Sequence, residues 1–269
     1  MNSTEPQANA PSPAASPATA LHRPMEWKRA WRALGRLIEE PKRTEEVFEI
    51  IDSLAGNSFE RQWQFFRAHP TGQRLLRERP SLLAALADRD ALRELPPGSL
   101  GRAYLDFMTS GGLTAEGLVA AEVAAAERNP NRLPADPERD FLGDRMRDMH
   151  DLWHVLTGYG MDEAGEAANL AFNLGQVASP GIALIVFAGA VVGPKDLRLS
   201  WPRYLYRAWR RGHRAVNLTV ARYERLLPQP LDDVRRLLRI EPVAVAHPGG
   251  IVVGNRSADH EHWVMQPSH

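Results

Sequence analysis

The sequence predicts an all-α fold. Segments with apolar residues at helical spacing recur along most of the chain, Pro and Gly separate them, and alternating strand patterns are scarce, with Ile251–Val253 the one mild candidate. Of the 269 residues, 43% are hydrophobic and 25% charged, which is typical of a globular protein with a substantial core. We expect one helical domain at 26–241, a disordered leader at 1–25 that is poor in apolar residues, and an irregular tail at 242–269.

The helices in the first half of the chain are predicted from the residues that start and end them. Ser or Thr at a helix start accepts hydrogen bonds from the free amide groups of the first turn, and Gly or Pro ends the helix. These signals predict helices over 44–56, 58–70, 81–92, 100–108 and 114–128. Three prolines predict a loop over 129–137.

The second half continues in the same way. Here the helices are expected over 144–157, 163–178, 182–192, 204–227 and 231–238. The segment from Tyr204 to Leu227 is expected to be one long helix, and basic residues recur at three- to four-residue spacing from Arg203 to Arg214. Gly158 and Gly160 predict a tight turn, so the two helices beside it are expected to run antiparallel.

Composition excludes several functions. The 33 Lys and Arg residues balance 33 Asp and Glu residues, which argues against a general nucleic-acid binder, since such proteins need excess positive charge. The chain has no Cys, so disulfides, thiol catalysis and cysteine-held metal clusters are excluded. Any metal ion must therefore be bound by His, Asp and Glu.

Four residues form a candidate metal site. His150 and His154 lie one helical turn apart and share a face, and Asp151 lies at the edge of that face. Glu166 follows after the predicted turn, so an antiparallel helix can bring it opposite the histidines. Two imidazoles and two carboxylates suit Zn, Fe or Mn.

Other interpretations of the histidines remain open. The two imidazoles also fit an ordinary solvent-exposed helix face. A zinc protease of the zincin type needs Glu after the first His, but Asp151 stands there and has a shorter reach. A phosphohydrolase of the His-Asp type needs further His and Asp ligands on other helices.

Residues 167–194 form a run of 28 residues without charge. Pro180 interrupts it, so a membrane span is not expected, and the run predicts either buried core helices or the wall of an apolar pocket or membrane-contacting surface. Arg and aromatic residues at 201–225 form a basic face, which predicts solvated surface or contacts with anionic groups. His260 and His262 offer a second metal site or simply belong to a flexible tail.

The motif His150-Asp151-x-x-His154, with Glu166 twelve residues later, resembles the metal motif of the Coq-four family, the fourth coenzyme Q (ubiquinone) biosynthesis protein. The segment Leu95–Met108 resembles the family's Leu-Pro-x-Gly-Ser-x-Gly-x-x-Tyr signature. Further similarities are Gly165 before Glu166, Trp209-x-x-Gly212, Arg222-Tyr-Glu224 and Leu231–Leu238. The resemblance covers roughly residues 30–241, and the lack of a clear transit peptide is typical of a bacterial member.

The resemblance implies an all-helical protein with a divalent metal ion, foremost zinc, bound by His150, Asp151, His154 and Glu166. It implies decarboxylation of a polyprenyl hydroxybenzoate, with hydroxylation of the same ring carbon in some accounts, and therefore a carboxy-lyase. An alternative is a non-catalytic prenyl-lipid scaffold that gathers the other ubiquinone-biosynthesis enzymes. We expect a homodimer in the cytoplasm, peripherally associated with the inner membrane. Iron or manganese would replace zinc if oxygen chemistry is needed, because zinc has no redox chemistry.

Overall fold

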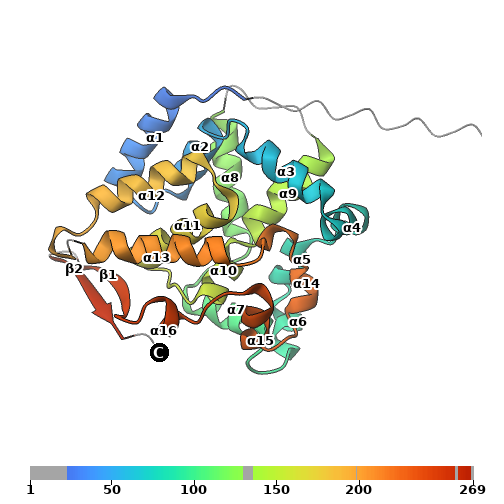
Figure 1. The fold of residues 1–269 in the computed structure, drawn as a ribbon. Coiled ribbons are helices and arrows are strands. Elements are labelled where there is room, and N and C mark those ends of the chain that lie inside the picture. The colour runs from blue at the N-terminus through green and yellow to red at the C-terminus, as the bar shows by residue number, and fades with distance from the viewer. Residues whose placement is uncertain (1–22, 130–135, 198, 258–259, 268–269) are drawn as a thin grey trace, which may run out of the picture.

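The structure, a computed structural model, consists almost entirely of helices (Figure 1). It describes residues 23–129, 136–197, 199–257 and 260–267. The first half contains α1 (Trp27–Glu39), α2 (Thr44–Ser53), α3 (Ser58–Ala68), α4 (Pro70–Glu78), α5 (Leu82–Ala87), α6 (Arg89–Glu94), α7 (Leu100–Ser110), α8 (Gly117–Glu127) and α9 (Pro137–Asp148). The second half contains α10 (His150–Thr157), α11 (Glu163–Val177), α12 (Pro180–Val192), η1 (Lys195–Leu197), α13 (Ser200–Arg214), η2 (Leu218–Val220), α14 (Tyr223–Leu226), α15 (Leu231–Leu238) and α16 (Val243–Ala246).

The all-α prediction is confirmed. Of the predicted leader, residues 1–22 lie outside the described residues, and Arg23 is held against α2 by an ion pair with Asp52 at 2.7 Å. Of the predicted starts, Thr44 and Ser58 are the first residues of α2 and α3, and Ser81 accepts a hydrogen bond from an amide in the first turn of α5. The start predicted at Thr114 is wrong, because α8 begins at Gly117.

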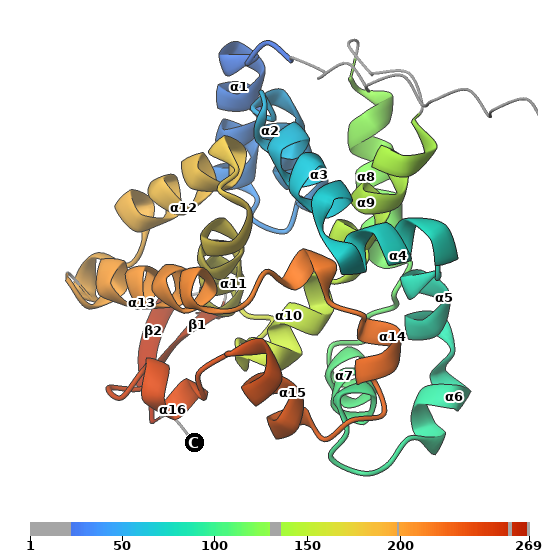
Figure 2. The ribbon, with the colours of Figure 1, turned by 45° about the vertical axis from the view of Figure 1, so that its right-hand side comes forward.

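The main core is built around α10 and α11. Figure 2 shows α10 in the middle of the molecule with α11 beside it, and α11 also packs against α12 and α13. Trp153 of α10 is fully buried and meets the ring of Phe172 on α11 edge to face, with ring centres 5.9 Å apart. Close helix packing comes from small residues, since a Cβ at Gly212 of α13 would lie 2.0 Å from the carbonyl oxygen of Phe172. These contacts fix the two site-bearing helices relative to each other.

The predicted long helix over 204–227 is wrong. Helix α13 ends at Arg214, and Ala215 has extended backbone with ψ of 159°. The next amides find partners outside a helix: Val216 N donates to Leu238 O at 3.0 Å, and Leu218 N donates to the Gln176 side chain at 2.8 Å. After Arg214, hydrogen bonds to distant residues therefore replace the i to i−4 hydrogen bonds of a helix.

Two further predicted helices are each divided in two. Asp88 ends α5 and caps α6 by accepting a hydrogen bond from Ala91 N at 3.0 Å, so the predicted helix over 81–92 becomes two short ones. The helix predicted over 144–157 starts earlier, at Pro137, and bends at Met149, which separates α9 from α10. The bend gives the two helices different axes and turns α10 inward.

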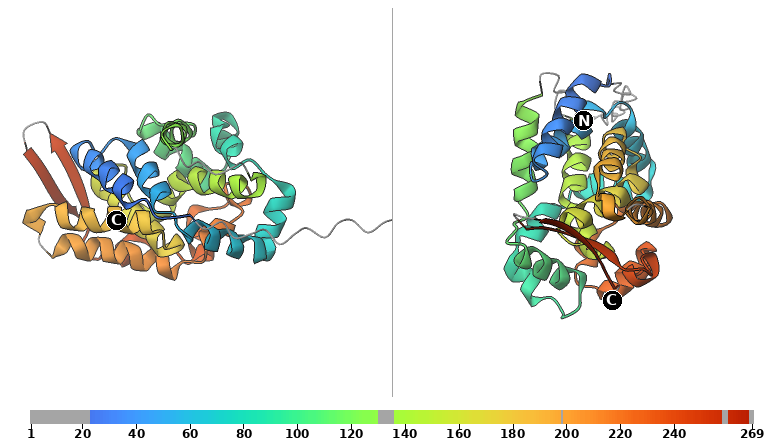
Figure 3. Two further views of the ribbon diagram at one scale, coloured as in Figure 1. Left: turned by 90° about the horizontal axis from the view of Figure 1, so that it is seen from above. Right: turned by 90° about the vertical axis from the view of Figure 1, so that its left-hand side faces the viewer.

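The tail contains an antiparallel hairpin. Strands β1 (Ile251–Ser257) and β2 (His260–Gln266) pair from Ile251 with Gln266 to Ser257 with His260, so the mild strand signal at Ile251–Val253 is confirmed and extended. Val252 is buried in the main core. The hairpin lies at one end of the molecule, beside α11 and α13 (Figure 3). The side chains of His260 and His262 lie outside what the structure describes.

Helix α12 is not the buried core helix that its composition favoured. One side of it, through Leu184, Ile185 and Ala188, packs against the cluster formed by α1 and α2. The other side faces outward, where the Phe187 side chain is 68% exposed and Val191 is also largely exposed. An apolar surface of this kind usually contacts a lipid or another protein. No helix within the described residues is long and apolar enough to span a membrane.

Candidate metal centre

A tight connection places the metal-motif residues of α10 and α11 opposite each other. Helix α10 ends at Gly158, whose positive φ of 78° suits glycine, and Asp162 caps α11 by accepting hydrogen bonds from the amides of Ala164 and Gly165. A Cβ at Gly165 would lie 2.1 Å from the carbonyl oxygen of Gly160, so only glycine fits there. The first turn of α11 can therefore approach the end of α10 closely.

The structure brings His150, His154 and Glu166 together. Each offers one ligand atom, and all three atoms lie within 4.8 Å of one another. The Oε2 atom of Glu166 lies 3.3 Å from Nε2 of His154 and 3.9 Å from Nε2 of His150. This is the convergence that the helical spacing and the short turn predicted.

Asp151 lies beside this group and not within it. Its Oδ1 lies 3.1 Å from Nδ1 of His150, on the side of the ring that faces away from Glu166. A carboxylate only accepts, so this contact places the proton of the neutral His150 ring on Nδ1 and leaves the lone pair on Nε2. In this arrangement Asp151 orients an imidazole, as carboxylates next to metal-binding histidines commonly do.

His154 also presents an unprotonated nitrogen. Its Nδ1 lies 3.2 Å from the carbonyl oxygen of Tyr159, and because a carbonyl only accepts, Nδ1 carries the proton of the neutral ring. The Nε2 atom is buried, makes no hydrogen bond to any described residue, and lies 3.3 Å from a carboxylate oxygen of Glu166. Two electron pairs facing each other repel, and a cation between them removes the repulsion. The residues present therefore fit a divalent metal ion with mixed nitrogen and oxygen ligands.

The electrostatics of the group agree with this geometry. Burial alone would raise the pKa of the Glu166 carboxyl, but the His154 and His150 imidazoles outweigh it and lower that pKa. Burial alone would lower the pKa of His150, but its contacts with Asp151 and Glu166 raise it. The Glu166 carboxylate thus attracts positive charge, whether that charge is a proton on the imidazoles or a metal ion.

Three contacts around the group were not predicted. Phe107 of α7 stacks on the His154 ring at 5.5 Å and covers it, so His154 is only 1% exposed, whereas the Glu166 side chain is 43% exposed. Arg235 donates to the carbonyl oxygens of Val155 and Leu156, both at 3.0 Å, and Arg211 donates to that of Thr157 at 2.6 Å. These arginines complete the open end of α10. No local sequence signal pairs them with that helix.

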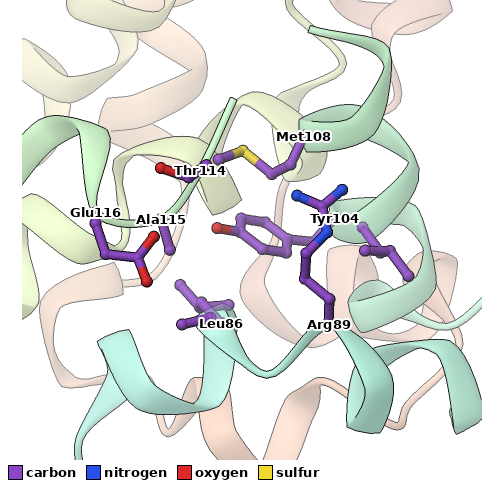
Figure 4. Close-up of a pocket in the computed structure, with 9 residues that line it drawn as sticks. Leu86, Arg89, Tyr104, Met108, Thr114, Ala115 and Glu116 are labelled. Atoms are coloured by element: carbon purple, nitrogen blue, oxygen red, sulfur yellow. The ribbon is translucent and has the colours of Figure 1, made fainter. Parts of the chain in front are cut away.

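A pocket of about 170 Å³ lies between α5 and α7 (Figure 4). Tyr104, Met108 and Arg89 line it together with residues 114–116, and burial raises the pKa of Tyr104 well above its ordinary value. None of the four predicted site residues lines this pocket. Residues 167–194 do not line it either.

Comparison with known proteins connects this geometry to a family. A family model described as "Coenzyme Q (ubiquinone) biosynthesis protein Coq4" matches residues 30–244. The chain belongs to the Coq4 family. The resemblance seen in the sequence is thereby confirmed, and this is a protein of the ubiquinone-biosynthesis family.

Individual relatives agree. The chain is 30% identical over 175 residues to the mitochondrial ubiquinone biosynthesis protein coq-4 of Neurospora crassa, covering 65% of this chain and 48% of that protein. It is 29% identical to the mitochondrial COQ4 homologue of Rattus norvegicus, covering 78% of this chain and 76% of that protein. The chain thus spans about half the length of the Neurospora relative and three quarters of the rat one.

A solved structure shares the fold. It is the crystal structure of a Nostoc punctiforme protein described as a "Putative ubiquinone biosynthesis protein", and it matches with a TM-score of 0.59 at 20% identity, over 81% of this chain and 100% of that one. At this identity the likeness shows the fold alone.

The Leu95–Met108 signature of the family has a structural explanation. Ser99 caps α7, and the amides of Leu100 and Gly101 donate to the carbonyl oxygens of Gln229 and Leu227. A Cβ at Gly101 would lie 2.3 Å from the Leu95 side chain and 3.2 Å from the carbonyl oxygen of Leu227, so a larger residue would require Leu95 to move. The signature therefore anchors the helix that carries Phe107 over His154.

Proposed function

We propose that the chain is a metal-dependent decarboxylase that removes the ring carboxyl of a polyprenyl hydroxybenzoate in ubiquinone biosynthesis. The observation that carries the proposal is the convergence of His150, His154 and Glu166, whose ligand atoms lie within 4.8 Å of one another, with the buried Nε2 of His154 lacking a hydrogen-bond partner among the described residues. The family supports the pathway, and the donor set supports a divalent ion, foremost zinc, or iron or manganese if hydroxylation accompanies the reaction.

His150, His154 and Glu166 would hold the ion, with Asp151 orienting His150 or joining as a fourth ligand. Bound there, the ion would act as a Lewis acid toward a carboxylate or phenol oxygen. Tyr159 keeps the proton of His154 on Nδ1, and Phe107 excludes water from the buried side of that ring. The open side lies at Glu166, which is the exposed member of the group. Loss of CO₂ from the ring carbon leaves an electron pair there that one proton must neutralise.

The surroundings suit a prenylated substrate. The outward face of α12, which includes Phe187 and Val191, offers apolar surface for an isoprenoid chain or for the edge of a bilayer. We propose that the protein associates peripherally with the inner membrane of a bacterial cell, from the cytoplasmic side, as a homodimer and together with other ubiquinone-biosynthesis enzymes. Vesicle flotation with Phe187→Asp and Val191→Asp variants tests the membrane contact.

The decisive experiment separates an enzyme from a scaffold. Purified protein is analysed for bound metals and incubated with a polyprenyl hydroxybenzoate, with and without oxygen, while release of CO₂ is measured. Under the proposal, Glu166→Gln lowers metal content and abolishes decarboxylation, whereas the fold survives and Glu163→Gln on the same helix turn has little effect.

The alternative is a non-catalytic scaffold in which the metal only links α10 to α11. The apolar outward face of α12 is the observation that favours it, since a scaffold also needs lipid contact. In that case the wild-type protein binds metal but releases no CO₂, and Glu166→Gln lowers the melting temperature.

A further inference from the structure

Asn169 on α11 is buried and has no hydrogen-bond partner within the protein. The residue is 1% exposed, and neither its Nδ2 nor its Oδ1 atom makes a hydrogen bond to any described residue. The Oδ1 atom of Asn173, one helical turn further along, is also buried and also makes no hydrogen bond to any described residue. Because an amide loses its water on burial, an unpaired one is unfavourable and calls for an explanation.

The rest of the helix shows that α11 normally satisfies its amides. Gln176 donates through Nε2 to the carbonyl oxygen of Gly212 at 2.5 Å and accepts through Oε1 from the amide of Leu218 at 2.8 Å. The unpaired state of Asn169 is therefore specific to its position and not to the helix.

That position lies next to the candidate metal centre. Residues three and seven places after Glu166 share its face of the helix, and a rise of about 1.5 Å per residue puts Asn169 about 5 Å further along the axis. Asn173 continues the same strip. The neighbouring residues Ala168, Ala171 and Phe172 are fully buried and apolar. Helix α11 runs from its connection with α10 at Glu163 to its connection with α12 at Val177, and Figure 1 shows it between these two helices.

We propose that Asn169 binds the aromatic head group of the substrate. Its carbonyl oxygen can accept from a ring hydroxyl, and its NH2 group can donate to a hydroxyl or methoxyl oxygen beside the carboxylate that faces the His150–His154–Glu166 cluster. A substituted benzene ring is about as long as the separation of Asn169 from Glu166 along the helix. This inference rests on the proposed function and adds a specificity residue to it, because a site built to pair a hydroxyl rejects rings that lack one.

The test uses opposite effects on stability and binding. Leu is close to Asn in shape but has no polar atoms, so Asn169→Leu removes the unpaired amide from the metal-free, ligand-free protein and the melting temperature rises by about 2–4 °C. The same variant, loaded with zinc, binds 4-hydroxy-3-methoxybenzoate carrying a farnesyl chain roughly 10-fold more weakly, followed by tryptophan fluorescence. Its zinc affinity stays that of wild type. The smaller variant Asn169→Ala gives the same loss of binding without added bulk.

Asn217→Leu is the matched control. The Asn217 side chain accepts hydrogen bonds from the amide and the hydroxyl of Thr219 at 3.0 and 2.6 Å, so its loss lowers the melting temperature and leaves binding unchanged. The proposal is overturned if Asn169→Leu lowers the melting temperature while binding stays the same. If wild type itself fails to bind the prenylated acid, the proposed function falls as well. If wild type binds and both Asn169 variants bind equally tightly, only the role of Asn169 is refuted.

Discussion

His247 makes the stability of the protein sensitive to acid. The residue caps the C-terminus of α16 and is 1% exposed, and its Nε2 lies 2.7 Å from the hydroxyl of Tyr159. Burial foremost, and then the charges of Arg211 and Arg207, lower the pKa of His247 from 6.5 to about 3. The folded protein thus holds this imidazole neutral under conditions that protonate it in the unfolded chain.

The sign and size of the effect follow from linkage. Below pH 6.5 the unfolded chain binds a proton that the folded protein refuses, so stability is fully present above pH 6.5 and is lost as the pH falls toward about 3. Well below pH 6.5 each pH unit removes about 1.4 kcal/mol. Because the unfolded imidazole is only half protonated at pH 6.5, the free energy of unfolding falls by about 2 kcal/mol between pH 6.5 and pH 4.5. Because other groups also titrate, the wild-type curve alone does not isolate this residue.

The variant His247→Gln isolates it. Glutamine can keep a hydrogen bond to the Tyr159 hydroxyl but does not titrate in this range. Urea unfolding of both proteins at several pH values gives the difference in unfolding free energy, and this difference should shrink by about 1.4 kcal/mol per pH unit as the pH is lowered. If the two proteins lose stability in parallel from pH 6.5 to pH 4.5, the imidazole is not held neutral and the reasoning is refuted.

Three other predictions test the candidate metal centre. Gly165→Ala forces its methyl group against the carbonyl of Gly160, so unfolding free energy falls by about 1–3 kcal/mol and zinc affinity falls with it; unchanged affinity in a calorimetric titration contradicts the close approach of α11. Arg235→Gln removes charged donors from the end of α10 and lowers stability by about 2 kcal/mol in urea, whereas the exposed neighbour Arg236→Gln has little effect; equal effects disprove the capping role. Zinc affinity falls about 10-fold per pH unit below the raised pKa of His150, because zinc competes with a proton there, and a flat pH profile excludes this residue as a ligand.

Local spacing predicted the parts of the structure that depend on neighbouring residues. The i, i+4 spacing of His150 and His154 and the short turn before Glu166 led directly to the observed convergence. Asp151 was grouped with them because spacing gives an approximate direction, but not which ring atom a carboxylate meets. The break after Arg214 was missed because the apolar and basic pattern continues past it, while the amides that leave the helix pair with distant groups.

Tertiary contacts account for the rest. Composition indicated that α12 is apolar, yet it cannot tell a helix buried on all sides from one such as this, where Phe187 faces outward. The sequence could not predict the unpaired amide of Asn169 either, because an Asn in a helix is expected to face solvent until the residues that pack around it are known. Phe107 lies in the Leu95–Met108 segment, which resembles a family signature. That resemblance was therefore a signal that could have led to the contact between Phe107 and His154.

The arginines at the end of α10 tie the histidine helix to parts of the chain synthesised much later. All four motif residues precede position 167, yet Arg211 and Arg235 are needed to occupy the carbonyls of residues 155–157. A truncated chain that ends before α13 would retain every motif residue and still leave that helix frayed at its open end. During synthesis, the His–His–Glu arrangement would therefore become rigid only after the C-terminal helices emerge and dock against α10.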